Sequence, residues 1–216
     1  MAPLLFLFFS CALPGNFQSR SAGDVDGRNI RRIAVLPPAE ERPLPERGQP
    51  PYAAAPAAAP QAKEDEPSVV LSNHIYSAMA TFPQWQIVSE REVREVVAEI
   101  SKGTEAARAR KLGELVHADA VVSGRVIYYR ERVGEEWGVK SPASVSFVID
   151  LWDVRRGDIV WSGRFEETQR ALSENIFALG GFAQRGARWL KAEELALEGV
   201  KTAVAELHQI LYRRQG

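Results

Sequence analysis

The sequence predicts an α/β (α+β) domain in which a mixed sheet of about five strands, with an antiparallel meander, is flanked by about four helices. Three observations predict this class. Apolar residues recur at helical spacing in four segments, and they alternate at strand spacing within residues 118–168. The third is the order of elements: strand, helix, strand, two helices, three strands, helix. A mixed sheet with helices packed on it accounts for that order.

The first half of this domain contains two short strands and the first helices. Residues 30–36 form a short apolar run, ended by a proline pair, and predict the first strand. Residues 68–81 carry one apolar face at helical spacing, and residues 85–88 read as another short strand. Ser89, followed three residues later by Glu92, forms a capping box that predicts the start of the next helix.

The second half contains the meander and the longest helix. A helix over 104–117 precedes strands over 118–132 and 143–154, and a turn at 155–158 joins the last of these to its partner strand. A final helix is predicted over 189–212. The residues expected to face the core are Ala143, Val145, Phe147, Ile149 and Leu151, then Ile159, Trp161, Gly163 and Phe165, then Ala196, Val200, Ala203, Val204, Leu207 and Leu211.

The amino terminus has the features of an export signal. Residues 2–9 are almost entirely apolar, which is far shorter than the about 20 residues of a bilayer-spanning helix and typical of a signal-peptide core. A small residue then precedes Cys11, the only cysteine. This arrangement resembles the lipobox of bacterial lipoproteins, and the resemblance implies that residues 1–11 are a signal peptide ending at a lipidated Cys11. The alternative is a buried strand over residues 4–9 with Cys11 in a core.

Two segments are predicted to lie outside regular structure. Residues 12–29 are largely polar and Gly/Ser-rich, which indicates a flexible tether. Residues 37–67 hold nine of the thirteen prolines. They contain too little apolar bulk to pack, so we expect a disordered Pro/Ala-rich insert that gives reach or freedom of movement. A ligand for an SH3-like domain is the alternative for this insert. The single α/β domain is expected to occupy residues 30–212.

No pattern in the sequence indicates catalysis. The net charge of −1 gives no general attraction to nucleic acid. The three histidines lack zinc-helix spacing, and neither a nucleophile elbow nor a phosphate-binding glycine loop occurs. One cysteine excludes an internal disulfide. We therefore expect no catalytic residue, no cofactor and no metal.

Aromatic and arginine residues near the predicted strands favour a partner-binding surface. Interfaces are enriched in Tyr, Trp and Arg. The candidate residues are Tyr129, Arg130, Arg132, Trp137 and Trp152. The alternative is that Tyr129 and Trp152 simply pack beneath a helix.

Four stretches also resemble a group of bacterial envelope lipoprotein domains: RRIAVLPP, FPQWQIVSEREVREVVAEI, KLGELVHADAVVSGRV and ASVSFVIDLWDVRRGDIVWSGRF. The group includes the amino-terminal domain of the Tol translocation protein, the penicillin-binding-protein activators and the curli-secretion lipoproteins. In the third stretch, Leu112-Gly113 leading into Ala118-Asp119-Ala120 reads as the end of a helix, a turn and a strand, and Gly124 permits close packing on that strand.

The resemblance implies a lipid-anchored, non-catalytic module that binds a protein partner. It also implies a place on the periplasmic face of the outer membrane, since Ala12 is not the Asp that signals inner-membrane retention; the inner membrane stays the alternative location. The alternative function is an oligomeric secretion or envelope-assembly component, and an envelope enzyme is the third.

Overall fold

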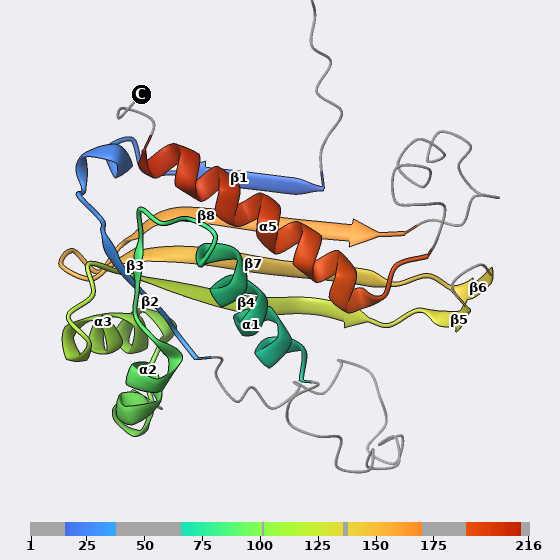
Figure 1. The fold of residues 1–216 in the computed structure, drawn as a ribbon, viewed down its shortest axis with the longest axis horizontal. Helices are drawn as coiled ribbons and strands as arrows, with labels where there is room; N and C mark the ends of the chain where they lie inside the picture. The colour runs from blue at the N-terminus through green and yellow to red at the C-terminus, as the bar shows by residue number, and fades with distance from the viewer. Residues whose placement is uncertain (1–15, 38–65, 101, 136–137, 170–188, 213–216) are drawn as a thin grey trace, which may run out of the picture.

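A computed structural model describes residues 16–37, 66–100, 102–135, 138–169 and 189–212. They form a six-stranded mixed sheet in the order β1-β8-β7-β4-β2-β3, a two-stranded hairpin β5-β6, and four α-helices (Figure 1). The strands are β1 (Phe17–Ser21), β2 (Arg32–Val35), β3 (Gln86–Ile87), β4 (Ala120–Arg130), β5 (Val133–Glu135), β6 (Gly138–Ser141), β7 (Ser144–Asp153) and β8 (Ile159–Thr168). The helices are α1 (Pro67–Met79), α2 (Glu90–Val96), α3 (Glu105–Leu115) and α5 (Ala192–Leu211). The predicted fold class is confirmed.

The sheet has a parallel part and an antiparallel part. Strand β2 runs parallel to both of its neighbours, β3 and β4, and Ile33 pairs with Ala120. The predicted first strand therefore joins the sheet. Strands β4, β7, β8 and β1 are successively antiparallel, which is the predicted meander with one further strand added at its edge.

The predicted tether over residues 12–29 is wrong from Phe17 onward. Residues Phe17–Ser21 are edge strand β1, and the Phe17 ring stacks on Trp161 at 6.3 Å between centroids. The sequence of β1, FQSRS, has one apolar residue, because an edge strand that is covered on one face needs no more. That polar composition resembles a linker, which is why the strand escapes pattern analysis.

Buried Arg28 fixes the chain between β1 and β2. Its guanidinium lies 3.0 Å from Asp24, 3.2 Å from Asp153 and 2.6 Å from Asp158. The hydrogen bond with Asp158 raises the pKa of Arg28, and Arg28 in turn holds the pKa of Asp158 and of Asp24 below the usual carboxyl value. This clamp joins the amino-terminal segment to the β7–β8 hairpin.

The predicted Pro/Ala-rich insert connects two elements of the fold. Its residues 38–65 lie outside the described part of the chain. On one side, the Pro37 carbonyl accepts a hydrogen bond from Arg108 Nη2 at 2.9 Å. On the other, Pro67 is the first residue of α1. Strands β1 and β2 precede the insert in the chain and already belong to the sheet. The insert therefore does not lie between Cys11 and the domain, so it cannot extend the distance between an anchor at Cys11 and the domain.

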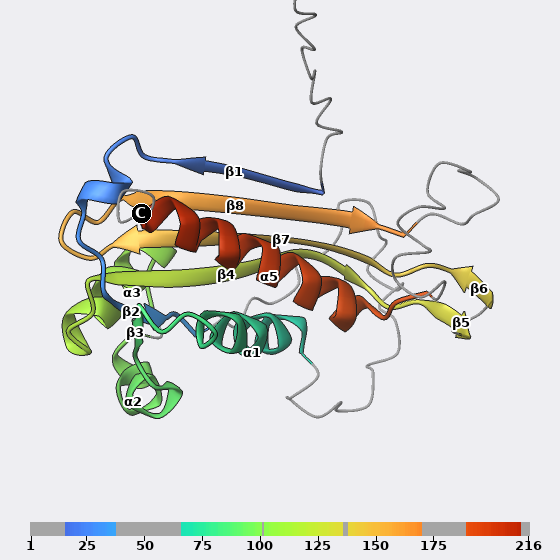
Figure 2. The same cartoon turned by 45° about the horizontal axis from the view of Figure 1, so that its top comes forward.

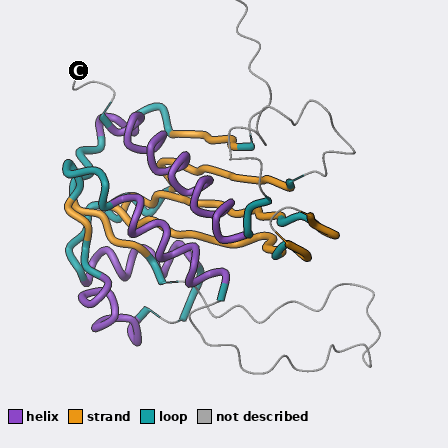
Figure 3. Tube along the Cα trace, turned by 45° about the vertical axis from the view of Figure 1, so that its right-hand side comes forward, coloured by secondary structure: helices purple, strands orange, loops and turns teal. Residues whose placement is uncertain are grey.

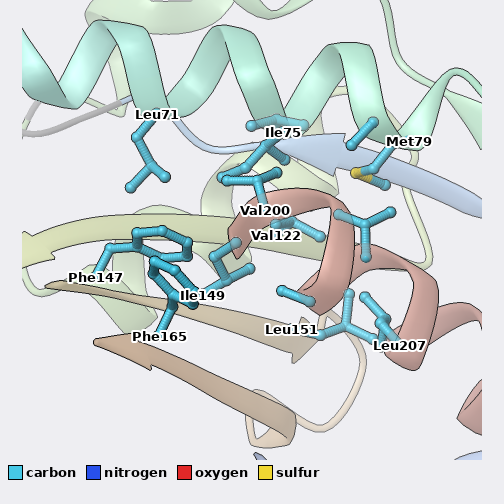
Figure 4. Packing of buried hydrophobic residues seen from close by; sticks show 14 of the residues in the cluster. Leu71, Ile75, Met79, Val122, Phe147, Ile149, Leu151, Phe165, Val200 and Leu207 are labelled. Carbon is cyan, nitrogen blue, oxygen red and sulfur yellow. The ribbon is translucent and has the colours of Figure 1, made fainter. Parts of the chain in front are cut away.

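One face of the sheet is covered by α1 and α5, which contact each other (Figure 1, Figure 3). The predicted apolar set of β7, Ala143 to Leu151, is buried here, as is the predicted stripe of α5 (Figure 4). Gly124 lets α1 approach β4, because a Cβ at this position would lie 2.8 Å from Ile75. Ile159, predicted to face this core, is 37% exposed, because a register irregularity in the hairpin buries Val160 in its place.

The other face carries a smaller core beneath α2 and α3 (Figure 2). Ser89 Oγ accepts the Glu92 amide and begins α2, as predicted, and Thr104 caps α3 in the same way. Gly113 permits α3 to pack on the end of β7, since a Cβ there would meet Val154 at 2.1 Å. Val121 and Leu112 are buried in this second core, which lies at the β2–β3–β4 end of the sheet.

Candidate partner-binding face

The outer half of the second sheet face has no helix over it in the described part of the chain. The residues on it alternate with the core residues of the same strands, and we call this surface the open face. It comprises Gln18 and Arg20 of β1; Ser162, Arg164, Glu166 and Thr168 of β8; Ser144, Ser146, Val148, Asp150 and Trp152 of β7; and Ser123, Arg125, Tyr128 and Arg130 of β4, with Ile127 and Ile159 at its irregular positions.

Two hollows lie along the open face. The first, of about 630 Å³, is bordered by β1 and by the start of α3, and Asp150, Trp152 and Ser162 line it. The second, of about 450 Å³, lies toward the β5–β6 hairpin and is lined by Tyr128, Ser146 and Thr168 among others. The two hollows follow one another along β7, since Val148 lines the first and Ser146 the second, and Arg164 borders both.

A hydrogen-bond chain fixes the wall of the first hollow. Trp152 Nε1 donates to Ser123 Oγ at 2.9 Å, and that hydroxyl donates to Glu105 Oε1 at 2.5 Å. Glu105 Oε2 accepts from Arg125 Nη1 at 2.9 Å. Because Glu105 is the first residue of α3, the chain ties the helix start to β4 and β7 and holds the indole in place.

Asp150 lies at the bottom of the first hollow and is 6% exposed. Burial raises the pKa of this carboxyl, while a hydrogen bond from the Ser162 hydroxyl works in the opposite direction. Glu105 raises the pKa further, and Arg125 and Arg20 lower it. The first hollow therefore has a buried acid surrounded by a rim of arginines.

The second hollow has hydroxyl groups along its bottom. Ser144 Oγ and Thr168 Oγ1 are 2.6 Å apart and share a hydrogen bond. Ser146 is 5% exposed, and its buried hydroxyl has no hydrogen-bond partner in the described part of the chain. Arg130 lies over the Tyr128 ring, with its guanidinium carbon 5.2 Å from the ring centroid. Polar hydrogen-bonding groups thus outnumber apolar ones in this hollow.

The structure divides the five candidate partner-binding residues. Trp152 and Arg130 lie on the open face. Arg130 of β4 pairs with Ser144, which is eight residues from Trp152 along β7. Tyr129 points to the opposite face and packs on the α1–α5 core, where burial raises its pKa to about 12. Arg132 donates to the Trp189 carbonyl at 3.0 Å. Trp137 and Cys11 lie outside the described residues.

The alternative interpretation, packing beneath a helix, is correct for Tyr129, and Trp152 also borders the α3 core. Sequence reasoning missed Asp150, Ser146 and Arg164. The signal for them was present, because they alternate with the apolar residues that the sequence assigns to the core.

The described residues show no constellation for metal chemistry. No group of three or more His, Cys, Asp or Glu side chains is placed to hold a metal ion in the ranges that the structure covers. Within the same ranges, no helix combines the length and the apolarity needed to cross a bilayer.

The chain matches no family model, and no curated protein resembles it in sequence. Solved structures with a similar arrangement include the PelC dodecamer from Paraburkholderia phytofirmans, at 12% identity and a TM-score of 0.46 over 88% of this chain and 95% of that one. Lipoprotein GNA1162 from Neisseria meningitidis is similar at 18% identity and a TM-score of 0.42, over 72% of this chain and 93% of that one. The LpoB C-terminal domain from Salmonella enterica is similar at 14% identity and a TM-score of 0.38, over 64% of this chain and 83% of that one. With each of these TM-scores below 0.5, the likeness carries no functional argument.

Proposed function

We propose that this protein is a lipid-anchored, non-catalytic module of the bacterial cell envelope that binds a protein partner through the open face. The observation that carries the proposal is that helices cover the two faces of the sheet unequally. Helices α1 and α5 bury one face, whereas the opposite side of β1, β8 and β7 presents a hollowed, rigid surface.

The composition of the open face supports this role. Five large apolar side chains are exposed in the described residues, and three of them, Ile127, Tyr128 and Ile159, belong to the open face. Clustering of exposed apolar groups marks interaction surfaces, and arginines beside aromatic rings are typical of interface anchors. A sheet framework also keeps these groups in place before binding, which lowers the entropic cost of association.

The proposed anchor is Cys11, with the periplasmic face of the outer membrane as the location. Strand β1 begins at Phe17, six residue steps after Cys11. At about 3.5 Å per residue, those steps span at most about 21 Å. The lipidated chain would therefore hold the β1 edge of the sheet close to the membrane, within reach of partners that are themselves at that surface.

Acyl labelling tests the anchor. Cells that express the chain with its native upstream region are fed an alkyne-tagged fatty acid, and the wild type is compared with Cys11→Ala. We expect label and membrane fractionation for the wild type and neither for the variant. An unlabelled wild type would contradict the anchor and leave the open face to be tested by itself.

Site-specific photocrosslinking tests the surface. A benzoylphenylalanine at Gln18 or Val148 of the open face is compared with one at Thr202, exposed on α5. We expect one common crosslinked product from both open-face positions and none from Thr202. A product of twice the chain mass would instead support the oligomeric assembly component, and equal products from all three positions would refute the open face.

A further inference from the structure

We propose that the ligand of the open face is an extended acidic peptide segment of the partner, lying along β7. This inference rests on the proposed function and names the chemistry that the same surface recognises. Three features carry it: the shape of the two hollows, a buried hydroxyl without a partner among the described residues, and two arginines that have no ion pair within those residues.

The shape of the surface fits an extended chain. The two hollows follow one another along β7, from Trp152 in the first to Ser144 in the second, and Arg164 borders both; together we call them the groove. Eight residue steps at about 3.3 Å give a groove about 26 Å long, which accommodates about eight residues of extended peptide.

The bottom of the groove offers hydrogen bonds that the fold leaves unused. Ser146 Oγ is buried and has no partner among the described residues. Buried hydroxyls are normally hydrogen-bonded, and each exception calls for a reason. An extended peptide displays its own N–H and C=O groups to the side, and one of them can reach Ser146 Oγ once the side chains that cover this hydroxyl move aside on binding.

The charges on the rim favour carboxylates. Arg20 and Arg130 have no ion-pair partner in the described residues, and Arg125 and Arg164 pair only with Glu105 and Glu166 at 2.9 and 2.8 Å. The Arg164–Glu166 pair is well exposed, at 50% and 64%, and exposed pairs contribute little. A ligand carboxylate can therefore replace Glu166 at small cost, and Arg–carboxylate contacts are strong and directional.

The spacing of the rim favours a peptide over a membrane surface or a single anion. In the strand register, Arg20 lies level with Asp150 of β7, Arg125 and Arg164 with Val148, and Arg130 with Ser144, so neighbouring levels are two and four residues apart. An extended peptide with an acidic residue at every second position, one about every 6.6 Å, places a carboxylate at each of these levels. Arg20 and Arg130 lie at opposite ends of the groove, so one small anion cannot contact both.

Fluorescence anisotropy with the full chain tests the inference. The probe is a labelled peptide of about eight residues in which Glu and Ser alternate, and the control peptide has Gln in place of Glu. We expect salt-sensitive binding of the acidic peptide only, and at least about a tenfold loss of affinity in Arg20→Gln/Arg130→Gln. The matched control Arg91→Gln, on the exposed side of α2, should bind as the wild type does.

A second variant separates binding from folding. Ser146→Ala removes a hydroxyl that has no partner in the described part of the chain, so the melting temperature of the variant should equal or exceed that of the wild type, while its affinity for the acidic peptide should fall. Equal binding of both peptides, or an equal loss in Arg91→Gln, would overturn the inference. Tighter binding of an acidic oligosaccharide such as oligogalacturonate, or of anionic vesicles, would overturn the peptide class. If crosslinking marks the open face but the acidic peptide fails to bind, the inference falls and the proposed function stands.

Discussion

The two faces of strands β7 and β8 differ although the same strands build both. On one face, Phe147, Trp161 and Phe165 are each no more than 4% exposed and pack toward α5. On the other, Ser146 and Arg164 line a groove that no described helix covers. Strand alternation therefore places the core on one side and the surface that we propose for partner binding on the other, so substitutions can separate the two.

The largest effect should come from the covered face. Phe147→Ala removes a fully buried ring that stacks on Phe165 at 5.2 Å, and we expect the free energy of unfolding to fall by about 3–5 kcal/mol. Its neighbour Val148, on the open face, is only half-buried, so Val148→Ala should cost under about 1 kcal/mol. Urea unfolding of both variants measures the difference, and equal losses would contradict the assignment of the two faces.

The next effect should come from the clamp that holds the amino-terminal segment to the hairpin. Arg28→Met leaves buried Asp153 without its cation, and we expect a loss of about 3 kcal/mol. Because the pKa of Asp158 is lowered in the fold, this stabilisation is present above the ordinary carboxyl pKa and is lost as pH falls through the lowered value. Urea titrations at several pH values test it; a loss in Arg28→Met that does not diminish in acid would contradict the clamp.

A smaller effect is expected where the open face meets α3. Trp152→Phe removes the indole donor to Ser123, and the free energy of unfolding should fall by about 1 kcal/mol. A double-mutant cycle with Ser123→Ala isolates that bond in chemical denaturation. Strictly additive losses would show that the two side chains do not interact.

The smallest effect should be a stabilisation on the open face. Burial raises the pKa of Asp150, so the group favours the folded state below the unfolded carboxyl pKa and loses that contribution as pH rises through the raised value. Asp150→Asn should therefore be more stable than the wild type near pH 7, with an advantage that disappears toward about pH 4. Thermal melts over this range measure it, and an advantage independent of pH would contradict a buried acid.

The parts predictable from sequence are those with strong apolar alternation. The core sets of β7 and α5 and the cap at Ser89 follow from local patterns, whereas the helix end expected at Gly113 lies two residues later, at Leu115. The orientation of Tyr128 and Tyr129 does not, because an irregularity between Val126 and Tyr128 shifts the alternation by one residue and turns Tyr129 into the core. No local signal predicts such a shift.

Long-range contacts account for the other errors. Arg28 is buried only because Asp153 and Asp158, more than 120 residues away, meet it in space, and strand β1 is recognisable only beside β8. The residues of the open face follow from alternation once the core is assigned. How far α3 extends over this face, from its first residue Glu105 beside the first hollow, does not follow from alternation. Packing of distant elements, rather than local propensity, decides that.

Alkylation of one introduced cysteine at a time, in cells, tests most directly whether a partner covers the open face. Gln18→Cys on the open face and Thr202→Cys on α5 are both exposed in the fold, and Cys11 is retained in each. The rate of maleimide alkylation is measured in the native cell and on the purified chain. We predict that the Gln18→Cys variant is alkylated several-fold more slowly in the cell than as the purified chain, while the alkylation rate of Thr202→Cys changes little between the two. Equal ratios at the two positions, or slowing confined to Thr202→Cys, would contradict the open face as the partner-binding surface.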